Sequence, residues 1–407
     1  MRFFGGKVAR TEPVLPGAVR EVMASGNCSG CGGCAQIWPE LTMQIDGSGY
    51  SRPSATRAIA RDRKREHTFR RVCPGMTVKA PPRGPENHWL FGSYVRAWQA
   101  HATDEEVRFS GSSGGVLTAL AGYITSVSGG MVIGVGAEPS APTRSVPVRI
   151  TSREDALRSS GSRYAPVGVV SSDSLNSAAA VVGKPCEAAA VRALNETRGG
   201  DGPMVLSFFC AGTPRQDATI ELLRTQGIEP EEVTSLRYRG NGWPGDFVGT
   251  AADGREARAS YDDSWGKYLG RTLQTRCKIC VDGTGELADV AVGDYWQTDS
   301  AGYPSFSDAP GSSVLIARTE RGARLVERAI ADGLIEAVPL DLDLVARIQP
   351  LQRDRRRTLY GRLAGRILAG KRIPKYRGFG LARLGVSNAP ASARAAVGMW
   401  TRSLGLR

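Results

Sequence analysis

The sequence has few histidines and no long apolar run. No stretch approaches the roughly 18 consecutive apolar residues that a transmembrane helix needs, and residues 1–20 lack the apolar core and cleavage site of a signal peptide. The three histidines, His67, His88 and His101, do not have the spacing of a Cys₂His₂ zinc finger, and so few histidines disfavour a histidine-based hydrolase. We therefore expect a cytoplasmic protein, in which the eight cysteines stay reduced and can act as metal ligands.

Acidic residues are almost absent from the C-terminal tail, residues 351–407. The tail has one acid, Asp354, against 14 of the 53 Lys and Arg residues of the chain, so it accounts for the whole net charge of +13. Arginines at 353 and 355–357, followed by Leu359, Tyr360, Leu363, Ile367 and Leu368, predict a basic amphipathic helix. Such a helix can pack on the protein body, lie on an anionic membrane as a peripheral contact, or bind an acidic partner; we do not expect nucleic acid.

Segments typical of strands alternate with segments typical of helices through the middle of the chain. The strand-type segments are residues 94–102, 131–135, 179–182 and 204–209, and the helix-type segments are residues 114–125, 187–194, 216–225 and 320–332. With hydrophobic residues at 41% and charged residues at 23%, the chain can bury a core. The pattern predicts a mixed α/β (α+β) fold with a central α/β body.

Composition shifts divide the chain into four predicted segments. Residues 1–80 form a small cysteine-rich module, and a proline-rich linker at 79–85 separates it from the body. The body comprises an α/β domain at 89–232 and a strand-rich domain at 233–350, which contains a C-x₂-C pair. The basic tail at 351–407 follows.

The first cysteine set has closely spaced ligands. Cys28, Cys31 and Cys34 are separated by two-residue spacers with glycines, which lets three thiolates converge on one cuboidal cluster. Cys73, followed by proline as in bacterial ferredoxin runs, is the natural fourth ligand. The pattern predicts a ferredoxin-like [4Fe–4S] module, with zinc as the alternative.

The second cysteine set has ligands far apart in the sequence. Cys186 and Cys210 follow two predicted strands, whose ends can face one crevice, and Cys277 and Cys280 form the C-x₂-C pair. The alternative is that Cys186 and Cys210 are ordinary buried small residues. Spacing alone leaves both interpretations open.

Two Ser–Gly loops are candidates for cofactor binding. The first, residues 109–115, precedes an amphipathic helix, whose N-terminal N–H groups can bind a phosphate, although a flexible turn explains the loop equally well. The second loop, Ser159 to Tyr164, adds a cation, Arg163, for a phosphate or flavin carbonyl and an aromatic ring, Tyr164, for stacking.

These motifs, in this order, resemble the beta-subunit family of coenzyme F420 hydrogenase/dehydrogenase, which includes the plant 7-hydroxymethyl chlorophyll a reductase. The matching elements are Cys28-x₂-Cys31-Gly-x-Cys34, Ser112 to Gly115, Gly161 to Tyr164, Gly183 to Cys186, Phe209–Cys210 and Cys277-x₂-Cys280-x-Asp282-x₂-Gly285–Glu286-x₂-Asp289-x₃-Gly293–Asp294. The resemblance covers about residues 28 to 350.

The resemblance implies an iron–sulfur flavoprotein oxidoreductase with two [4Fe–4S] clusters and FAD. All eight cysteines would be cluster ligands, and the central body would bind the flavin. The implied FAD-binding residues are Ser110, Ser112, Ser113, Gly114, Gly115, Thr118, Gly161, Ser162, Arg163 and Tyr164. Electrons would pass between the clusters, or a ferredoxin-type partner, and the flavin, with hydride exchange to coenzyme F420 or a related organic substrate.

Other roles stay open. The catalytic residue is unknown, with Lys184, Asp282 and Glu286 as candidates. Lys184 stands where the family commonly has a small hydroxyl residue, and a cation there would raise the reduction potential of a cluster or flavin. The alternative is that Lys184 is a solvent-facing lysine at a helix start. The turn at 241–245 lies near the substrate face or is purely structural. Alternative functions are a ferredoxin-dependent reductase of a non-F420 substrate, or a zinc-stabilised binding protein that is not an enzyme. The sequence leaves the oligomeric state open.

Overall fold

The structure is a computed structural model that describes residues 14–296 and 310–406. The expectation that residues 1–20 contain no signal peptide therefore concerns residues that lie largely outside the described ones. Small parts of the predicted segments 1–80, 233–350 and 351–407 also lie outside the described residues.

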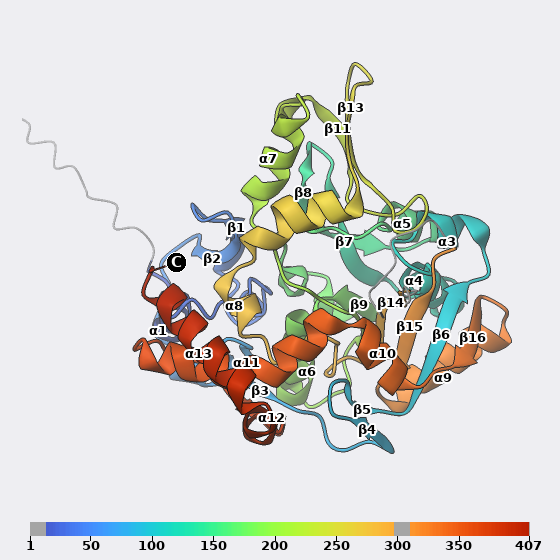
Figure 1. Ribbon diagram of the computed structural model, residues 1–407. Helices are drawn as coiled ribbons and strands as arrows, with labels where there is room; N and C mark the ends of the chain where they lie inside the picture. The colour runs from blue at the N-terminus through green and yellow to red at the C-terminus, as the bar shows by residue number, and fades with distance from the viewer. Residues whose placement is uncertain (1–13, 297–309, 407) are drawn as a thin grey trace, which may run out of the picture.

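An eight-stranded mixed sheet forms the centre of the protein (Figure 1), in the order β16-β6-β15-β14-β10-β9-β7-β8. Its strands are β6 (Arg96–Ala102), β7 (Val132–Glu138), β8 (Ala141–Ile150), β9 (Ala180–Gly183), β10 (Met204–Phe208), β14 (Val290–Asp294), β15 (Ser313–Ala317) and β16 (Ile335–Pro339). The four neighbours β14, β10, β9 and β7 run parallel, and the outer strands pair antiparallel. This sheet confirms the predicted mixed α/β fold.

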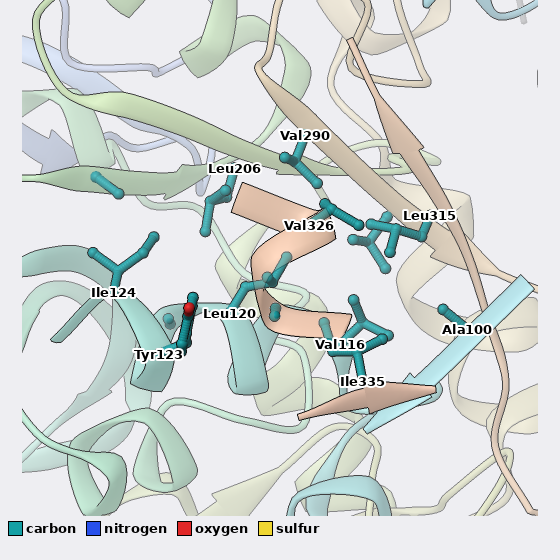
Figure 2. Packing of buried hydrophobic residues seen from close by; sticks show 14 of the residues in the cluster. Ala100, Val116, Leu120, Tyr123, Ile124, Leu206, Val290, Leu315, Val326 and Ile335 are labelled. Carbon is teal, nitrogen blue, oxygen red and sulfur yellow. The ribbon is translucent and has the colours of Figure 1, made fainter. Parts of the chain in front are cut away.

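Helices cover both faces of the sheet. The predicted helix at 114–125 is α4 (Val116–Ser128), and it packs with α9 (Glu320–Ala331) against one face, where Leu120, Val326 and Leu206 share a buried cluster (Figure 2). The helix α6 (Pro185–Arg198) packs on the other face. Because successive strand residues point to opposite faces, Ala180 belongs to the first cluster and Val181 to the second. The central strands are buried on both faces, which explains their near-continuous apolar runs.

The sheet draws strands from both predicted body segments, 89–232 and 233–350, so these segments share one sheet among the described residues. A separate three-stranded sheet stands beside it with the helix α7 (Gln216–Thr225), whose predicted bounds match the observed ones. Its strands are β11 (Val233–Arg237), β12 (Phe247–Ala251) and β13 (Glu256–Ala259).

The N-terminal module packs around its own core. Its elements are α1 (Gly17–Ala24), the hairpin of β1 (Leu41–Ile45) and β2 (Ser51–Ala55), α2 (Arg63–Val72) and β3 (Thr77–Lys79). The rings of Trp38 and Phe69 lie 5.5 Å apart in this core, which also contains Val19 and Leu41. The module contacts the body through α6.

The basic tail is part of the body. It forms α11 (Pro350–Leu368), β17 (Lys375–Arg377), α12 (Leu381–Ser387) and α13 (Ala389–Ser403), and β17 pairs parallel with β3 of the N-terminal module, so both ends of the described chain lie on one side of the molecule (Figure 1). The predicted apolar helix face is only partly right. Leu359 and Leu363 are buried, but Tyr360, Ile367 and Leu368 are exposed, because the body binds α11 through arginines as well. The packed-helix interpretation of the tail is therefore confirmed.

Two glycines allow α11 and α13 to pack closely. A Cβ added at Gly361 would lie 2.0 Å from the Ser392 carbonyl oxygen, and one at Gly365 would lie 2.1 Å from that of Ala396.

Among the described residues, no helix combines the length and apolar character needed to cross a membrane.

Candidate functional site

The predicted cofactor loops and two of the cysteines meet at one edge of the central sheet. Cys186 follows the carboxyl end of β9 and Cys210 that of β10, and these strands are parallel neighbours as predicted. The strand β15 runs antiparallel to β14, so its first residue, Ser313, lies at the same edge and accepts a hydrogen bond from the Gly114 amide at 2.9 Å. The carboxyl edge of parallel strands is the usual place for ligands in α/β proteins.

The first cysteine set sits in a tight glycine turn. Gly30 and Gly32 have positive φ, and added Cβ atoms would lie 2.6 Å from the Ser51 carbonyl oxygen and 2.5 Å from the Ser171 amide. The Gly33 amide donates to the Cys31 sulfur at 3.5 Å. Glycine is therefore required here both for backbone conformation and for space.

The cysteines of the first set lie in the interior of the module, with Cys31 buried and Cys28, Cys34 and Cys73 partly buried. Burial raises the pKa of Cys31 to about 11. Burial also raises the pKa of Cys34 well above its usual value, and the neighbouring charges of Cys28, Cys31 and Cys73 add to this effect. Four thiolates in such a place would need compensation by positive charge, which the irons of a cluster would supply.

The second cysteine set is assembled from three separate parts of the chain. Burial raises the pKa of Cys210 to about 12, with further contributions from the charges of Cys277 and Cys280. Burial also raises the pKa of Cys186 well above normal, and the charges of Cys31 and Cys210 contribute. The Thr213 amide donates to the Cys277 sulfur at 3.3 Å. Cys31 packs in one buried cluster with Ala188 and Ala190 of α6, the helix that begins at Pro185 and carries Cys186, so the two sets are neighbours.

Backbone packing holds the two sets together. The Val170 amide donates to the Cys31 carbonyl at 3.1 Å, and a Cβ at Gly168 would lie 2.8 Å from the Gly30 carbonyl oxygen. The segment 167–171 thus docks the glycine turn of the module onto the body.

The cysteine geometry can be tested against an iron–sulfur cluster. Among the described residues, no three Cys, His, Asp or Glu side chains approach closely enough to hold a single metal ion. In a cuboidal cluster each cysteine ligates a different iron, so its four sulfurs stand further apart than the ligands of one ion. Buried sulfurs, amide donors directed at them and nearby cations are compatible with a cluster at each set.

The two Ser–Gly loops contact each other. The hydroxyl oxygens of Ser112 and Ser162 lie 2.7 Å apart, and the Ser113 hydroxyl bonds the Ser312 carbonyl at 2.8 Å. Gly115 caps α4 with a left-handed conformation, and the Ser110 carbonyl accepts from Arg237 at 3.1 Å. The structure therefore brings most of the predicted flavin loop residues together; Thr118 lies one turn further along α4.

Arg163 and Tyr164 point into the protein. The Arg163 guanidinium donates to the carbonyls of Pro142 at 2.7 Å and Leu236 at 3.2 Å. The Tyr164 ring packs against protein rings, with 5.0 Å between its centroid and that of Trp265. These two side chains therefore have structural partners, and no sequence pattern indicates the carbonyls that bind Arg163.

A buried arginine cage beside these loops was not predicted. Arg239 forms an ion pair with Asp294 at 2.8 Å and lies over the rings of Tyr261 and Trp243 at 4.6 and 5.1 Å. The Arg239 amide donates to the Gly161 carbonyl at 3.1 Å, which ties the cage to the second Ser–Gly loop. The predicted turn at 241–245, with a cis Trp243–Pro244 peptide, borders a cavity of about 340 Å³. Trp296 also lies near the Arg239 guanidinium, at 5.6 Å. These aromatic residues are visible in the sequence, but only folding brings them around Arg239.

The catalytic candidates have well-defined contacts. Lys184 is buried, and its Nζ donates to Glu187 at 2.7 Å and to the Val167 carbonyl at 3.0 Å, so the solvent-facing interpretation is wrong. Asp282 accepts hydrogen bonds from three backbone amides, at 2.8 to 2.9 Å, and thereby orders the loop after Cys280. Glu286 forms a buried ion pair with Arg356 at 2.9 Å.

Sequence reasoning missed Glu187 and the arginines of the tail. Glu187 accepts from the Val169 amide at 3.0 Å and from the Lys184 amide at 2.7 Å; its place three residues after a helix cap was a usable signal. Arg355 of α11 donates to the Cys210 carbonyl at 3.0 Å, and Arg362 to the Lys278 carbonyl at 3.0 Å. The tail therefore braces the loops that carry the second cysteine set.

Comparisons with known proteins identify the family of the chain. Sequence profiles of coenzyme F420 hydrogenase/dehydrogenase beta subunits match residues 97–172 with their N-terminal part and residues 177–343 with their C-terminal part. The chain belongs to this family. The resemblance seen in the sequence is thus confirmed.

Relatives in this family include the coenzyme F420 hydrogenase beta subunits of Methanococcus voltae and Methanosarcina barkeri. Both are 26% identical to this chain over 63% of its length, and the matches cover 91% and 88% of these relatives. The coenzyme F420-dependent sulfite reductase of Methanocaldococcus jannaschii is 24% identical over 75% of this chain, which spans 46% of that protein. These relatives are oxidoreductases, and this chain is classed as one.

A solved structure shares the fold. A chain of the F420-reducing [NiFe] hydrogenase complex from Methanosarcina barkeri superposes with a TM-score of 0.51 at 24% identity, covering 67% of this chain and 91% of the other. The likeness supports the mixed α/β architecture.

Proposed function

We propose that this protein is an iron–sulfur flavoprotein that transfers electrons between a partner electron-transfer protein and coenzyme F420, or a related organic hydride carrier. Its cofactors would be two [4Fe–4S] clusters and FAD. The observation that carries this proposal is the packing of the first cysteine turn, through Cys31, on the helix α6 that carries Cys186, at the sheet edge that also holds the Ser–Gly loops. Membership in a family with F420-linked relatives supports the choice of substrate.

The residues of this chain would bind and shield these groups. Cys28, Cys31, Cys34 and Cys73 would hold one cluster, and the second cysteine set, Cys186, Cys210, Cys277 and Cys280, would hold the other. The Ser112–Ser162 contact would orient the flavin, which when bound exchanges a hydride for two single electrons. The Arg239 cage and the adjoining cavity would bind an anionic or aromatic part of the substrate.

A ferredoxin-type partner is the preferred electron carrier. The tail exposes Lys371, Arg372, Lys375, Arg383 and Arg394, which suit an acidic protein surface. Ferredoxin-dependent reduction of a substrate other than F420, as in 7-hydroxymethyl chlorophyll a reductase, fits the same basic surface. Peripheral membrane contact through residues 353–407 and a cytoplasmic location stay predictions.

The first experiment is metal, sulfide and flavin analysis of protein purified without oxygen, together with its absorption spectrum. We expect about eight irons, matching sulfide and one FAD per chain. About four irons would mean that one cysteine set is structural. Stoichiometric zinc in a colourless protein would overturn the proposal and favour the non-enzymatic binding protein.

Substrate choice requires a second assay. Protein with the expected cofactors is mixed with reduced ferredoxin, and the absorbance of added F420 is followed. Reduction of F420 supports the main proposal. Flavin reduction without turnover of F420 would favour the alternative organic substrate.

A further inference from the structure

Arg276 links the two cysteine sets through a single side chain. It lies in the short helix α8 (Thr275–Lys278), directly before Cys277 of the second set. Its Nη2 donates to the Pro74 carbonyl at 3.0 Å, and Pro74 follows Cys73 of the first set. Its side chain is 2% exposed, so the contact is shielded from water.

The charge of Arg276 lacks a counterion among the described residues. Its Nε and Nη1 have no hydrogen-bond partner within residues 14–296 and 310–406, and its guanidinium lies 5.7 Å from the centroid of the Tyr376 ring. Its electrostatic neighbours are Cys28 and Cys73 in the first set and Cys186, Cys277 and Cys280 in the second. An unpaired buried cation is costly, so this site needs negative charge on both sides.

Two other buried cations in this region are paired with carboxylates. Lys184 is neutralised by Glu187 at 2.7 Å, and Arg356 by Glu286 at 2.9 Å. Neither Arg276 nor Arg355 forms an ion pair with a carboxylate in the described part of the chain. The Arg355 guanidinium donates to the carbonyls of Cys210 and Ala211 and to Gln352, whereas Nε and Nη1 of Arg276 have no partner there. The full charge of Arg276 is therefore available to whatever the thiolates bind.

We propose that Arg276 is a positioning residue that couples the two clusters, holding the sets in register and stabilising the reduced form of both. This inference rests on the proposed function, because it assumes a cluster at each cysteine set. Each cluster gains one negative charge when it takes up an electron from the partner, and a fixed positive charge between the clusters favours that step for both.

The test is a redox titration of the whole protein, followed by electron paramagnetic resonance, on Arg276→Gln and Arg276→Lys. At a fixed potential, Arg276→Gln should lower the reduced-to-oxidised ratio of both clusters by about tenfold, which is about 59 mV for a one-electron couple. Arg276→Lys keeps the charge and should stay within about threefold of the wild-type ratio.

Arg321→Gln is the matched control. Arg321 is a partly buried arginine paired with Asp289 at 2.6 Å, and no cysteine is among its electrostatic neighbours. It should change stability and leave both potentials unchanged. Unchanged potentials in Arg276→Gln, or a shift confined to one cluster, would overturn the inference.

The iron content separates this failure from failure of the proposed function. If the wild-type protein holds no clusters, the proposed function itself fails. If Arg276→Gln alone cannot retain iron, Arg276→His is titrated from pH 5 to 8, since imidazole changes charge in this range. If the cluster potentials of Arg276→His rise more on acidification than those of the wild type, the inference is supported. If the two proteins show the same pH dependence, it is overturned.

Discussion

The two cysteine sets are built in opposite ways. In the first set, three of four cysteines lie within the seven residues from Cys28 to Cys34, and the Gly33 amide of the same loop donates to a sulfur. In the second set, Cys186 and Cys210 follow the ends of β9 and β10, Cys277 lies in α8 and Cys280 just after it, and the supporting contacts come from distant segments. The first set depends on local spacing, whereas the second depends on a correctly formed sheet and tail.

The supporting contacts make this difference concrete. Gln352 and Arg355 of α11 donate to the Cys210 carbonyl at 3.2 and 3.0 Å, across about 140 residues of sequence. Arg356 pairs with Glu286 in the loop after Cys280. The second set should therefore be lost when tertiary packing is disturbed, while the first set should survive.

The strongest test removes one ligand from each set. We expect Cys34→Ser and Cys277→Ser each to lose about four of about eight irons, because each removes a ligand of one cluster. Iron analysis and electron paramagnetic resonance should show that each variant lacks a different signal. Loss of the same signal in both variants would mean that the eight cysteines do not form two sets.

A second test acts on the tail contact alone. Glu286→Gln keeps the side-chain volume but leaves the buried Arg356 without its counterion, which should lower the free energy of unfolding by about 3–5 kcal/mol. During denaturation of this variant, we expect the second cluster to be lost at a lower urea concentration than the first cluster. Glu327→Gln removes the exposed pair with Arg96 and should cost about 1 kcal/mol or less. Simultaneous loss of both clusters in Glu286→Gln would contradict the difference between the sets.

A third test concerns the exposed charges of the tail. Replacing Lys371, Arg383 and Arg394 by Glu should slow electron transfer with an acidic ferredoxin about tenfold at low salt, because the attraction between the surfaces is lost. The difference should vanish at high ionic strength.

The control for this test has the same change of net charge elsewhere. Arg61, Arg83 and Arg149 are exposed and lie outside the tail, so their replacement by Glu should affect the rate much less. Equal rates for the two triple variants would place the partner on another surface.

The smallest effect is expected at a helix cap outside both sets. Asp104 caps α3 (Glu105–Ser110), accepting from the Glu106 and Val107 amides, and this helix leads into the first Ser–Gly loop. Asp104→Ala should lower the free energy of unfolding by about 1 kcal/mol, with both clusters retained. Urea denaturation with iron analysis checks this, and loss of either cluster would be unexpected.

Asp104 also gives a pH dependence with a definite sign. The hydrogen bond from Arg153 holds the pKa of Asp104 below its usual value. A carboxylate with a lowered pKa contributes stability above its unfolded pKa of about 3.9, and this contribution is lost as the pH falls through the folded pKa. Between pH 6 and 3, the wild type should therefore lose more stability than Asp104→Ala. Parallel pH profiles would contradict this assignment.

Most regular elements could be predicted, because their apolar periodicity is local. The helix Gln216–Thr225 matches the structure, and the strands ending near Cys186 and Cys210 differ by about one residue. The direction of Arg163 could not be predicted, because the carbonyls of Pro142 and Leu236 meet it only after folding. The same applies to Arg276 and Arg239, whose partners come from distant segments.

The sequence by itself determined the family, the mixed α/β class, the first cysteine set and the two Ser–Gly loops, since these depend on spacing and on residue types next to each other. Only the tertiary structure decided that the loops meet at the edge where Cys186 and Cys210 emerge, and that the basic tail packs against the body. Buried arginines explain the difference. In the sequence they make the tail look like a charged surface segment. In the fold, a buried guanidinium that donates to buried carbonyls and carboxylates stabilises the interior, and only folding brings those partners together.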